Sequence, residues 1–386
     1  LWSDSIESSS PLVNRCCTPD QMADARRVAD HLNIPFYVLD AQSQFRSSIV
    51  QQFIDEHLAG RTPNPCIACN RKIRFGYLLG HAQALGAQFL ATGHYARVKR
   101  TNESYELLRG TDPNKDQSYV LYTLTQEKLA RVLFPVGEFV KEHVRELAKE
   151  FGLPVAAKHD SQDLCFVVDG DHKGFLQRHG ENGFAPGLIV DQEGNELGQH
   201  EGLPFYTIGQ RKGLGISADR PLYILHKDKA RNAIVVGSRD ALGQKQFHVR
   251  DINWISGVPV TAEKQIEIKI RYKARAVPGH IDQSSSSEAI VKLSSPASGV
   301  TPGQGGQLPV RQCDIRLQPV AAYQLQDLQP ETGLAPAQAG LAHAQGELVQ
   351  HPRLTRRQGI GIPGGQFEPC TIQQHYRRAA TSEICN

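Results

Sequence analysis

Helix-like and strand-like segments alternate along the first part of this 386-residue chain, and the alternation restricts the folds open to it. Apolar side chains recur at helical spacing in three segments, 19–33, 47–60 and 71–86. Two shorter apolar runs have the pattern of buried strands, 36–40 and 87–94. Strands that alternate with helices predict a parallel α/β sheet, which binds ligands at the carboxyl ends of its strands. The segment "TGHYAR" (92–97) follows such a strand.

The pattern changes towards the C-terminus. Two more helices are predicted at 112–124 and 140–154, and beyond Phe166 come glycine-rich loops and short strands. In "QIEIKIRYKARAV" (265–277) the isoleucines share one face and the charged residues the other, as in a small antiparallel barrel with a basic outer surface. Because the chain is too long for one ordinary core, we expect an α/β domain (1–166), a central linking domain (167–243) and a β-barrel (244–305).

Both ends of the chain look unusual. The sequence begins at Leu1 rather than at methionine, and no lysine occurs after Lys292. Hydrophobic periodicity is lost after "SGVTPGQ" (298–304), where glutamine becomes frequent. A natural disordered tail would have such a composition, and so would an out-of-frame translation. We expect residues 306–386 to be unstructured and favour the out-of-frame interpretation.

Composition limits the compartment. No apolar run approaches the roughly 20 residues that a membrane helix needs, and we see no signal peptide. Eight cysteines in a chain of this length do not suggest a disulfide framework. The sequence therefore predicts a cytoplasmic protein that does not associate with membranes.

Charge is distributed unevenly. Residues 57–102 contain no Asp or Glu, yet they include seven basic residues, Arg61, Arg71, Lys72, Arg74, Arg97, Lys99 and Arg100. A run of like charge is commonly a solvated face. Here it surrounds a cysteine pair and has no counter-charge, so we expect a polyanionic partner, with nucleic acid the first choice.

Cys66 and Cys69 in "TPNPCIACNRKIRF" (62–75) are three residues apart. A closed zinc site would need a second ligand pair at set spacing, which the chain does not offer. Free cysteines are also common as inert core residues. Basic surroundings favour the thiolate, which is the nucleophile and the metal ligand. Cys165 in "HDSQDLCFV" (159–167) could equally be a packed core thiol.

Six ordered motifs resemble those of the tRNA-specific 2-thiouridylases, which replace the C2 oxygen of the wobble uridine by sulfur. They are "TPNPCIACNRKIRF", "ATGHYARV", "DPNKDQSYVLY", "DSQDLCF", "HEGLPFYTIGQRKGLGI" and "SGVTPGQ", within residues 1–304. The resemblance implies a PP-loop ATP-pyrophosphatase domain, use of ATP with Mg²⁺, tRNA as substrate, and a sulfur donor such as a cysteine desulfurase or relay protein. It also implies that ATP adenylates the uracil O2, that sulfur arrives from a persulfide, and that AMP leaves.

The resemblance assigns roles to the cysteines. Cys69 matches the nucleophilic cysteine, and Cys165 matches the cysteine that carries the persulfide and can later form a disulfide with the first. Two thiols suit this chemistry because one holds the sulfane sulfur while the other resolves it. Asn64, Pro65 and Cys66 match the segment that touches the target base, where many members have Asp in place of Cys66. Alternatively, Cys66, Cys69 and Cys165 would ligate a [4Fe–4S] cluster with one open iron.

Further residues match binding positions of the family. Gly93 matches an ATP contact, and the implied tRNA contacts are His94, Lys115, Asp116, Gln117, Arg271, Tyr272 and Gln304. The alternatives are a glycine at a strand end, a satisfied histidine, and a turn with a helix cap. Residues 206–216 read as a structural loop with basic side chains towards RNA.

One departure from the family concerns nucleotide binding. Its "SGGxDSS" phosphate loop has no match here, so we expect an N-terminally truncated domain that binds ATP poorly. A catalytically impaired tRNA-binding remnant is therefore the alternative to the active enzyme. An argininosuccinate-synthase-like enzyme acting on small molecules would share the fold but leave the paired thiols unexplained.

Overall fold

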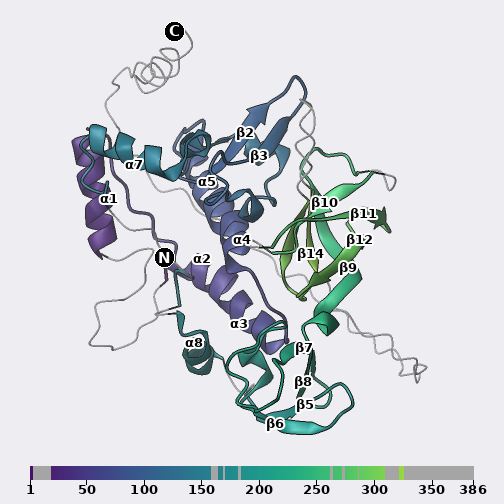
Figure 1. Ribbon diagram of the computed structural model, residues 1–386. Helices are drawn as coiled ribbons and strands as arrows, with labels where there is room; N and C mark the ends of the chain where they lie inside the picture. The colour runs from purple at the N-terminus through teal and green to yellow at the C-terminus, as the bar shows by residue number, and fades with distance from the viewer. Residues whose placement is uncertain are drawn as a thin grey trace, which may run out of the picture. The chain divides into compact units, whose positions relative to one another are not determined.

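The computed structural model (Figure 1) divides into two units, Leu1–Pro330 and Glu331–Asn386. It describes residues 1–2, 19–157, 164–167, 170–180, 184–260, 264–271, 274–285, 287–308 and 321–325, all of them in the first unit. No helix of these residues is both long and apolar enough to cross a membrane.

Helices dominate the N-terminal region. They are α1 (Pro19–His31), α2 (Gln42–Phe45), the π-helical turn η1 (Arg46–Val50) and α3 (Gln51–Leu58). The helices expected at 19–33 and 47–60 are confirmed. The second one ends at Leu58, and Gly60, two residues later, has a φ of +79°, in the left-handed region that glycine adopts at low cost. Phe45, Ile49 and Phe53 of this segment are buried in one hydrophobic cluster.

The helix expected at 71–86 begins earlier. It runs through α4 (Pro65–Cys69), the π-helical η2 (Asn70–Leu78) and α5 (Leu79–Ala84). Asn70 and Leu79, the residues at the two junctions, both have right-handed helical dihedral angles, so the three segments form one continuous helical run.

The sheet that follows is smaller than the sequence predicts. Among the described residues, parallel pairing in this region is limited to β1 (Leu90–Ala91) with β4 (Val132–Leu133). The predicted strand at 36–40 is wrong: these residues form no strand and pair with none among the described residues, and Tyr37 is 80% exposed. An antiparallel hairpin, β2 (Ala96–Arg100) and β3 (Tyr105–Arg109), was not expected.

The helix predicted at 112–124 is also wrong. This segment contains turns and a single 3₁₀ turn, η3 (Ser118–Val120). Its polar side chains accept hydrogen bonds from nearby backbone N–H groups, which are then not available for the hydrogen bonds of a helix. The elements that follow are α6 (Gln126–Leu129), η4 (Pro135–Glu138) and α7 (Lys141–Glu150), and α7 confirms the helix expected at 140–154.

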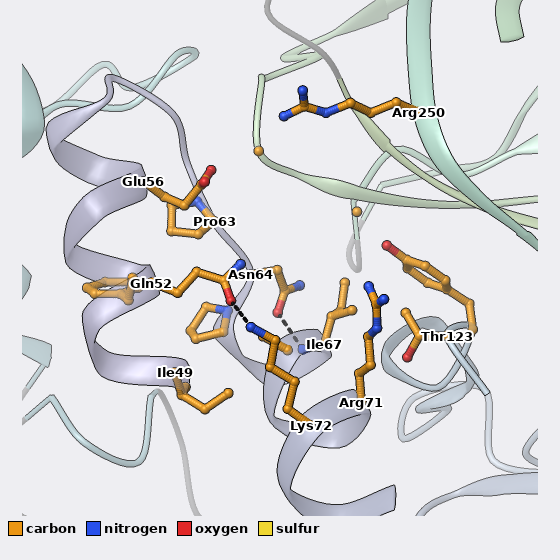
Figure 2. Close-up of a pocket in the computed structure, with 16 residues that line it drawn as sticks. Ile49, Gln52, Glu56, Pro63, Asn64, Ile67, Arg71, Lys72, Thr123 and Arg250 are labelled. Carbon is orange, nitrogen blue, oxygen red and sulfur yellow. Dashed lines mark hydrogen bonds between the residues drawn. The ribbon is translucent and has the colours of Figure 1, made fainter. Parts of the chain in front are cut away.

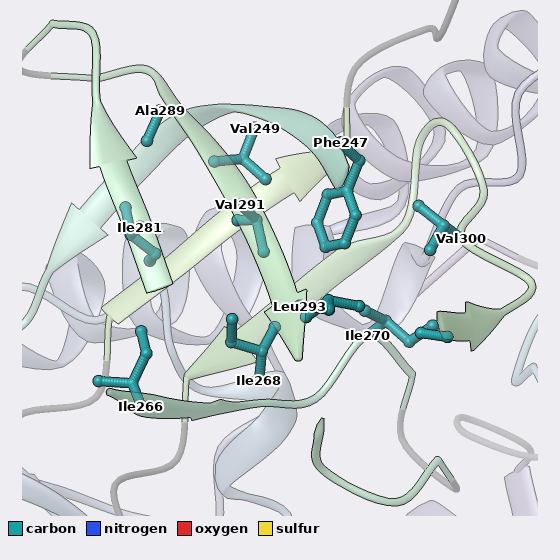
Figure 3. Packing of buried hydrophobic residues seen from close by; sticks show 11 residues of the cluster. Phe247, Val249, Ile266, Ile268, Ile270, Ile281, Ala289, Val291, Leu293 and Val300 are labelled. Atoms are coloured by element: carbon teal, nitrogen blue, oxygen red, sulfur yellow. The ribbon is translucent and has the colours of Figure 1, made fainter. Parts of the chain in front are cut away.

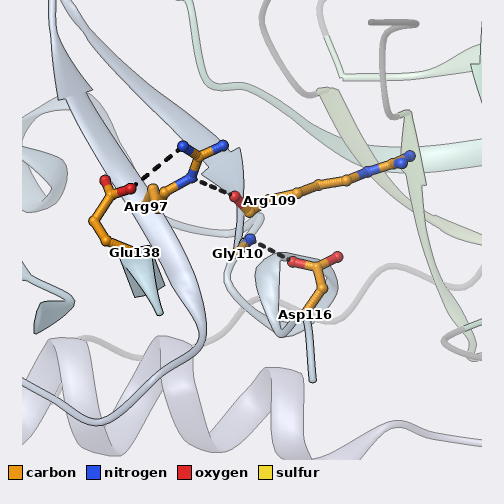
Figure 4. Close-up of polar contacts among 5 residues, drawn as sticks. All are labelled: Arg97, Arg109, Gly110, Asp116 and Glu138. Carbon is orange, nitrogen blue, oxygen red and sulfur yellow. Dashed lines mark hydrogen bonds and ion pairs between the residues drawn. The ribbon is translucent and has the colours of Figure 1, made fainter. Parts of the chain in front are cut away.

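Two glycines allow the hairpin to pack tightly against its neighbours. A Cβ on Gly137 would lie 1.8 Å from the Ala96 carbonyl oxygen, and one on Gly110 would lie 2.7 Å from the Tyr95 carbonyl oxygen. Figure 4 shows the polar contacts here: Arg97 Nε donates to the Arg109 carbonyl at 2.8 Å, and Arg97 Nη1 donates to the Glu138 carboxylate at 3.4 Å.

The central region carries a four-stranded sheet in the order β6–β5–β8–β7. The strands are β5 (Gly187–Val190), β6 (Glu196–His200), β7 (Tyr223–Asp228) and β8 (Ala233–Gly237). The helical elements are α8 (His172–His179) and the 3₁₀ turns η6 (Leu203–Phe205) and η7 (Asp240–Leu242). β5 and β8 are parallel, whereas the other two pairings are antiparallel.

The last region is a six-stranded antiparallel sheet in the order β10–β11–β12–β9–β14–β13. Its strands are β9 (Gly243–Trp254), β10 (Ile266–Ile268), β11 (Val277–Gln283), β12 (Ala289–Ser298), β13 (Gly305–Leu308) and β14 (Ala321–Leu325). Ile266, Ile268 and Ile270 are buried together on one face, as the alternation predicts (Figure 3). Hydrogen-bonded pairing among the described residues leaves β10 and β13 as edges, so the sheet is not closed into a barrel.

Two parts of the expected unstructured tail are strands. Residues 306–308 belong to β13, and β14 (Ala321–Leu325) pairs with β9 between Trp254 and Val249. The rest of 306–386 lies outside the described residues.

Candidate functional site

The helix that carries Cys66 and Cys69 begins at a local signal in the sequence. Asn64 is extended before Pro65, and its side-chain oxygen accepts a hydrogen bond from the backbone N–H of Ile67 at 3.4 Å. An Asn cap followed by proline in the first turn is a favourable helix start. Cys66, in the first turn, is exposed, whereas Cys69 at the end of α4 is half-buried.

Cys69 and Cys165 are far apart in the sequence but pack against the same hydrophobic cluster, which includes Phe53, Phe166 and Phe175. Cys165 is half-buried in the turn between Leu164 and Phe166. The fold therefore brings the two cysteines to one core, whereas Cys66 remains outside it.

The described residues do not gather the three cysteines as metal ligands. No group of three or more His, Cys, Asp or Glu side chains in this part of the chain could hold a metal ion. The donor set as arranged here therefore does not fit a three-cysteine [4Fe–4S] cluster, which needs three thiolates around one centre.

A loop of the last region packs against the segment that precedes the cysteines. The Thr62 N–H donates to the Pro302 carbonyl at 2.8 Å, and the Tyr119 hydroxyl donates to the Gly305 carbonyl. A Cβ on Gly305 would lie 2.5 Å from the Ile67 side chain. Pro302 belongs to the motif "SGVTPGQ" (298–304), and Gly305 follows the motif as the first residue of β13; its lack of a side chain permits the close approach.

Part of these segments lines an open cavity of about 490 Å³. Asn64, Pro65 and Gln304 line it, together with Leu164, the neighbour of Cys165. Three sequence-predicted site residues thus share one cavity, with the Cys165 segment at its wall. Further lining residues that the sequence did not single out include His57, His172, Lys173, Thr207 and Gln210.

His57 is a buried titratable residue in the wall of this cavity, and its protonation state follows from its surroundings. Burial, and secondarily Lys227, lowers its pKa to about 4, so the ring is neutral near pH 7. Its Nδ1–H donates to the Pro204 carbonyl at 3.2 Å, which leaves Nε2 as an acceptor. Lys227 is half-buried with its Nζ buried, and burial, followed by Lys229, lowers its pKa to about 8. Nothing in the motifs pointed to His57, but Thr207 and Gln210 lie in "YTIGQRKGLGI", which was expected to be structural.

Gly93 and His94 differ in their surroundings. Gly93 is exposed, and a Cβ there would meet nothing within 4 Å, so its backbone is open to a ligand. His94 is 5% exposed and lies between the rings of Phe75 and Phe134. Its Nδ1 is 2.7 Å from the Thr92 hydroxyl. Burial, and then Arg74, lowers its pKa to about 3, so His94 is a neutral core histidine here.

The predicted tRNA-facing segment 115–117 forms a turn. The Asp116 carboxylate accepts a hydrogen bond from the Gly110 N–H at 3.1 Å (Figure 4) and another from the Ser118 N–H at 3.1 Å. Gln117 exchanges bonds with the backbone of Tyr95, which places this segment beside "TGHYAR". Lys115 is half-buried, and its N–H donates to the Asp112 carbonyl at 3.2 Å.

Arg271 connects two regions. Its guanidinium donates to the Ile208 carbonyl at 3.2 Å and to the Thr301 hydroxyl at 2.9 Å. Burial lowers the pKa of this group from its usual value, with Tyr119 acting in the opposite direction. Tyr272, the other predicted residue of this pair, lies outside the described residues.

The architecture is an α/β region followed by two β regions, and comparison with known families agrees with this division. Residues 1–169 match the family described as tRNA methyl transferase HUP domain, 173–238 the tRNA methyl transferase PRC-barrel domain, and 244–308 the aminomethyltransferase beta-barrel domain.

Relatives specify the family further. The tRNA-specific 2-thiouridylase MnmA of Heliobacterium modesticaldum is 44% identical over 317 residues, which span 78% of this chain and 82% of the relative. The proteins of that name from Moorella thermoacetica and Magnetococcus marinus are each 45% identical, covering 79% of this chain and 85% of theirs. The chain belongs to the tRNA-specific 2-thiouridylase family.

Proposed function

We propose that this chain catalyses the ATP-dependent 2-thiolation of the wobble uridine of tRNA. The observation that carries the proposal is the placement of Cys69 and Cys165 on one hydrophobic cluster beside the cavity lined by Asn64, Pro65 and Gln304. Family membership supports the substrate and the reaction. The reducing cytoplasm and a sulfur-donor protein, such as a cysteine desulfurase or relay protein, are parts of the same proposal.

The cavity suits a flipped-out base. Its wall combines apolar groups such as Phe53 and Phe205 with amide side chains such as Gln210 and Gln304. Apolar and aromatic groups accept the face of an unstacked base, and amides can bond to its edge. Asn64 and Pro65 fix the start of the cysteine helix against this space.

Fewer of the described residues support the use of ATP. ATP with Mg²⁺ converts the uracil O2 into a leaving group by transferring its adenylyl group and releasing pyrophosphate. Gly93, with its open backbone, is the described residue that fits a nucleotide contact. Asp116, Gln117 and Arg271 contribute to tRNA binding by holding the loops that contact it, since their polar groups bond to backbone and to Thr301.

Sulfur transfer needs both thiols. The terminal sulfur of a Cys165 persulfide attacks C2, and AMP departs with the former O2. The Cys69 thiolate then attacks the Cys165 sulfur, the sulfur–sulfur bond of the persulfide breaks, and 2-thiouridine is released. The two electrons come from the cysteines, which end as a disulfide, and an external dithiol reduces it.

The test uses three serine variants of the full chain. With a tRNA bearing wobble uridine, ATP and a persulfide donor, 2-thiouridine is measured by mass spectrometry of the digested nucleosides and AMP by chromatography. Cys69→Ser and Cys165→Ser are expected to lose thiolation, while Cys66→Ser, whose thiol is exposed, retains it. Loss of activity in all three would contradict the persulfide route and favour three-cysteine ligation. Binding of tRNA without AMP release by the unmodified chain would identify the tRNA-binding remnant instead.

A further inference from the structure

A second, smaller cavity lies on the other side of Asn64 and Pro65. Its volume is about 60 Å³, several times the roughly 10–15 Å³ that one water centre requires. Residues from α3, η2, β9 and the Gly303–Gly305 loop line it (Figure 2). Nothing in the proposed reaction uses this cavity.

Three cations face the cavity from two different elements. Arg71 and Lys72 come from η2 and are exposed, and Arg250 comes from β9 and is half-buried. In Figure 2 Arg71 extends from the helix in the lower part of the view and Arg250 from the strand in the upper part. Lys72 donates to Gln52 at 2.9 Å. Arg250 Nε is buried and has no hydrogen-bond partner among the described residues.

Within the described part of the chain, the nearby acids do not neutralise these cations. Glu56, the acidic residue in the cavity wall, is held in two hydrogen bonds by Arg61, at 2.6 and 2.7 Å. Asp251, next to Arg250, is exposed and is not part of the wall. Lys128, whose Nζ lies 3.5 Å from the Arg71 carbonyl, adds further positive charge nearby. The cavity therefore has a surplus of positive charge and an unsatisfied buried donor.

Phosphate is the ligand that suits such a site. A guanidinium group presents paired donors that match two phosphate oxygens, and charge-assisted bonds of this kind are strong. A phosphate oxygen would also accept the bond that Arg250 Nε lacks. The wall shared with the larger cavity, at Pro63, Asn64 and Pro65, places the phosphate close to the base that we assign to that cavity.

We infer that this cavity binds a backbone phosphate of the RNA whose base occupies the larger cavity. The inference rests on the proposed function for the identity of the RNA. RNA is favoured over ATP because the site is built from side-chain cations around the target-base segment, whereas Gly93, the nucleotide contact, follows strand β1. The same phosphate chemistry in ATP is the competing source that the experiment must separate.

The test is the salt dependence of tRNA binding by the full chain. A tRNA with wobble uridine is titrated at several salt concentrations from about 50 to 200 mM. Each phosphate contact adds roughly 0.7–0.9 to the slope of log affinity against log salt. Arg250→Met is expected to weaken binding about tenfold at low salt and to reduce the slope by about one. Arg71→Met, on the exposed rim, gives the same direction without altering a half-buried position.

Lys245→Met is the matched control, because Lys245 is an exposed cation on the same strand, β9, and does not line the cavity. It is expected to leave both affinity and slope unchanged. Equal slopes for Arg250→Met, Arg71→Met and the unmodified chain would overturn the inference, while thiolation by the unmodified chain would keep the proposed function intact. A raised KM for ATP with an unchanged tRNA slope would assign the phosphate to the nucleotide and would also overturn it.

Discussion

At the scale of single residues, His57 and His94 make stability depend on pH. Burial lowers their pKa values from 6.5 to about 4 and about 3. Above pH 6.5 both rings are neutral in the folded and in the unfolded chain, so neither histidine lowers the free energy of unfolding there. As pH falls below 6.5 the unfolded chain binds protons that the folded chain does not, and stability is lost towards the folded pKa values.

We therefore expect the free energy of unfolding to fall between pH 6.5 and about 4, by at most about 1.4 kcal/mol per pH unit for each histidine. His57→Gln, which retains an N–H for the Pro204 carbonyl, should reduce this slope by about one proton. Urea denaturation at a series of pH values measures it. An unchanged slope in the variant would mean that His57 is protonated in the folded state.

Gly137 illustrates a residue whose lack of a side chain is structural. A Cβ at this position would lie 1.8 Å from the Ala96 carbonyl oxygen. Because that oxygen belongs to the backbone, it cannot easily move away to relieve the clash. Gly137→Ala is expected to lower the free energy of unfolding by about 1–3 kcal/mol. Gly80→Ala is the control, because Gly80 lies in α5 and a Cβ added there would meet no atom within 4 Å. This variant should raise the free energy of unfolding by about 0.5–1 kcal/mol. Thermal denaturation compares the two, and destabilisation by both would contradict this account.

At the scale of elements, the cap of α4 links sequence to site. Asn64→Ala removes the acceptor for the Ile67 N–H, and is expected to cost about 1 kcal/mol and to slow thiolation. Thr125→Ala removes the comparable cap of α6, at Lys128 N–H, and should cost similar stability with thiolation unchanged. Asn64→Asp keeps the cap, so a variant that is stable but inactive would show that the amide also contacts substrate. Equal thiolation rates in Asn64→Ala and the unmodified chain would refute the role of the cap.

Elements with local signals were predictable from the sequence. The strict alternation in 266–270 predicted the buried face of β10, and helical spacing predicted α1, α3 and α7. The strand at 36–40 failed because a strand exists only where a partner lies beside it, which an apolar run cannot specify. The helix at 112–124 failed because Asp112 and Asp116 bond to nearby backbone N–H groups and stabilise turns.

The site was predictable only where motifs carried it. Asn64, Pro65 and Gln304 were singled out from the resemblance, and the fold places them in one cavity. The sequence did not single out His57 or Arg250. The neutral ring of His57 and the unsatisfied Nε of Arg250 both arise from burial. Burial depends on packing between segments far apart in the chain, and spacing along the sequence does not reveal it.

At the scale of the whole molecule, contacts between regions hold the cysteine helix in place. The buried Tyr119 hydroxyl donates to the Gly305 carbonyl in the loop that packs on Ile67. Burial raises the pKa of Tyr119 well above its usual value, so the hydroxyl keeps its proton. Removing the hydroxyl leaves the buried Gly305 carbonyl without this hydrogen bond, which lowers the free energy of unfolding by about 1–3 kcal/mol.

Tyr119→Phe is therefore expected to destabilise the chain by that amount and, by loosening the loop against α4, to reduce thiolation. Tyr95→Phe is the matched control, because the buried Tyr95 hydroxyl has no hydrogen-bond partner in the described part of the chain. Its loss should be neutral or slightly stabilising. Urea denaturation and the 2-thiouridine assay, run on both variants, give the comparison. If the two variants behave alike, the Tyr119–Gly305 bond does not couple the last region to the cysteine helix, and the loop's position must depend on the Thr62–Pro302 bond instead.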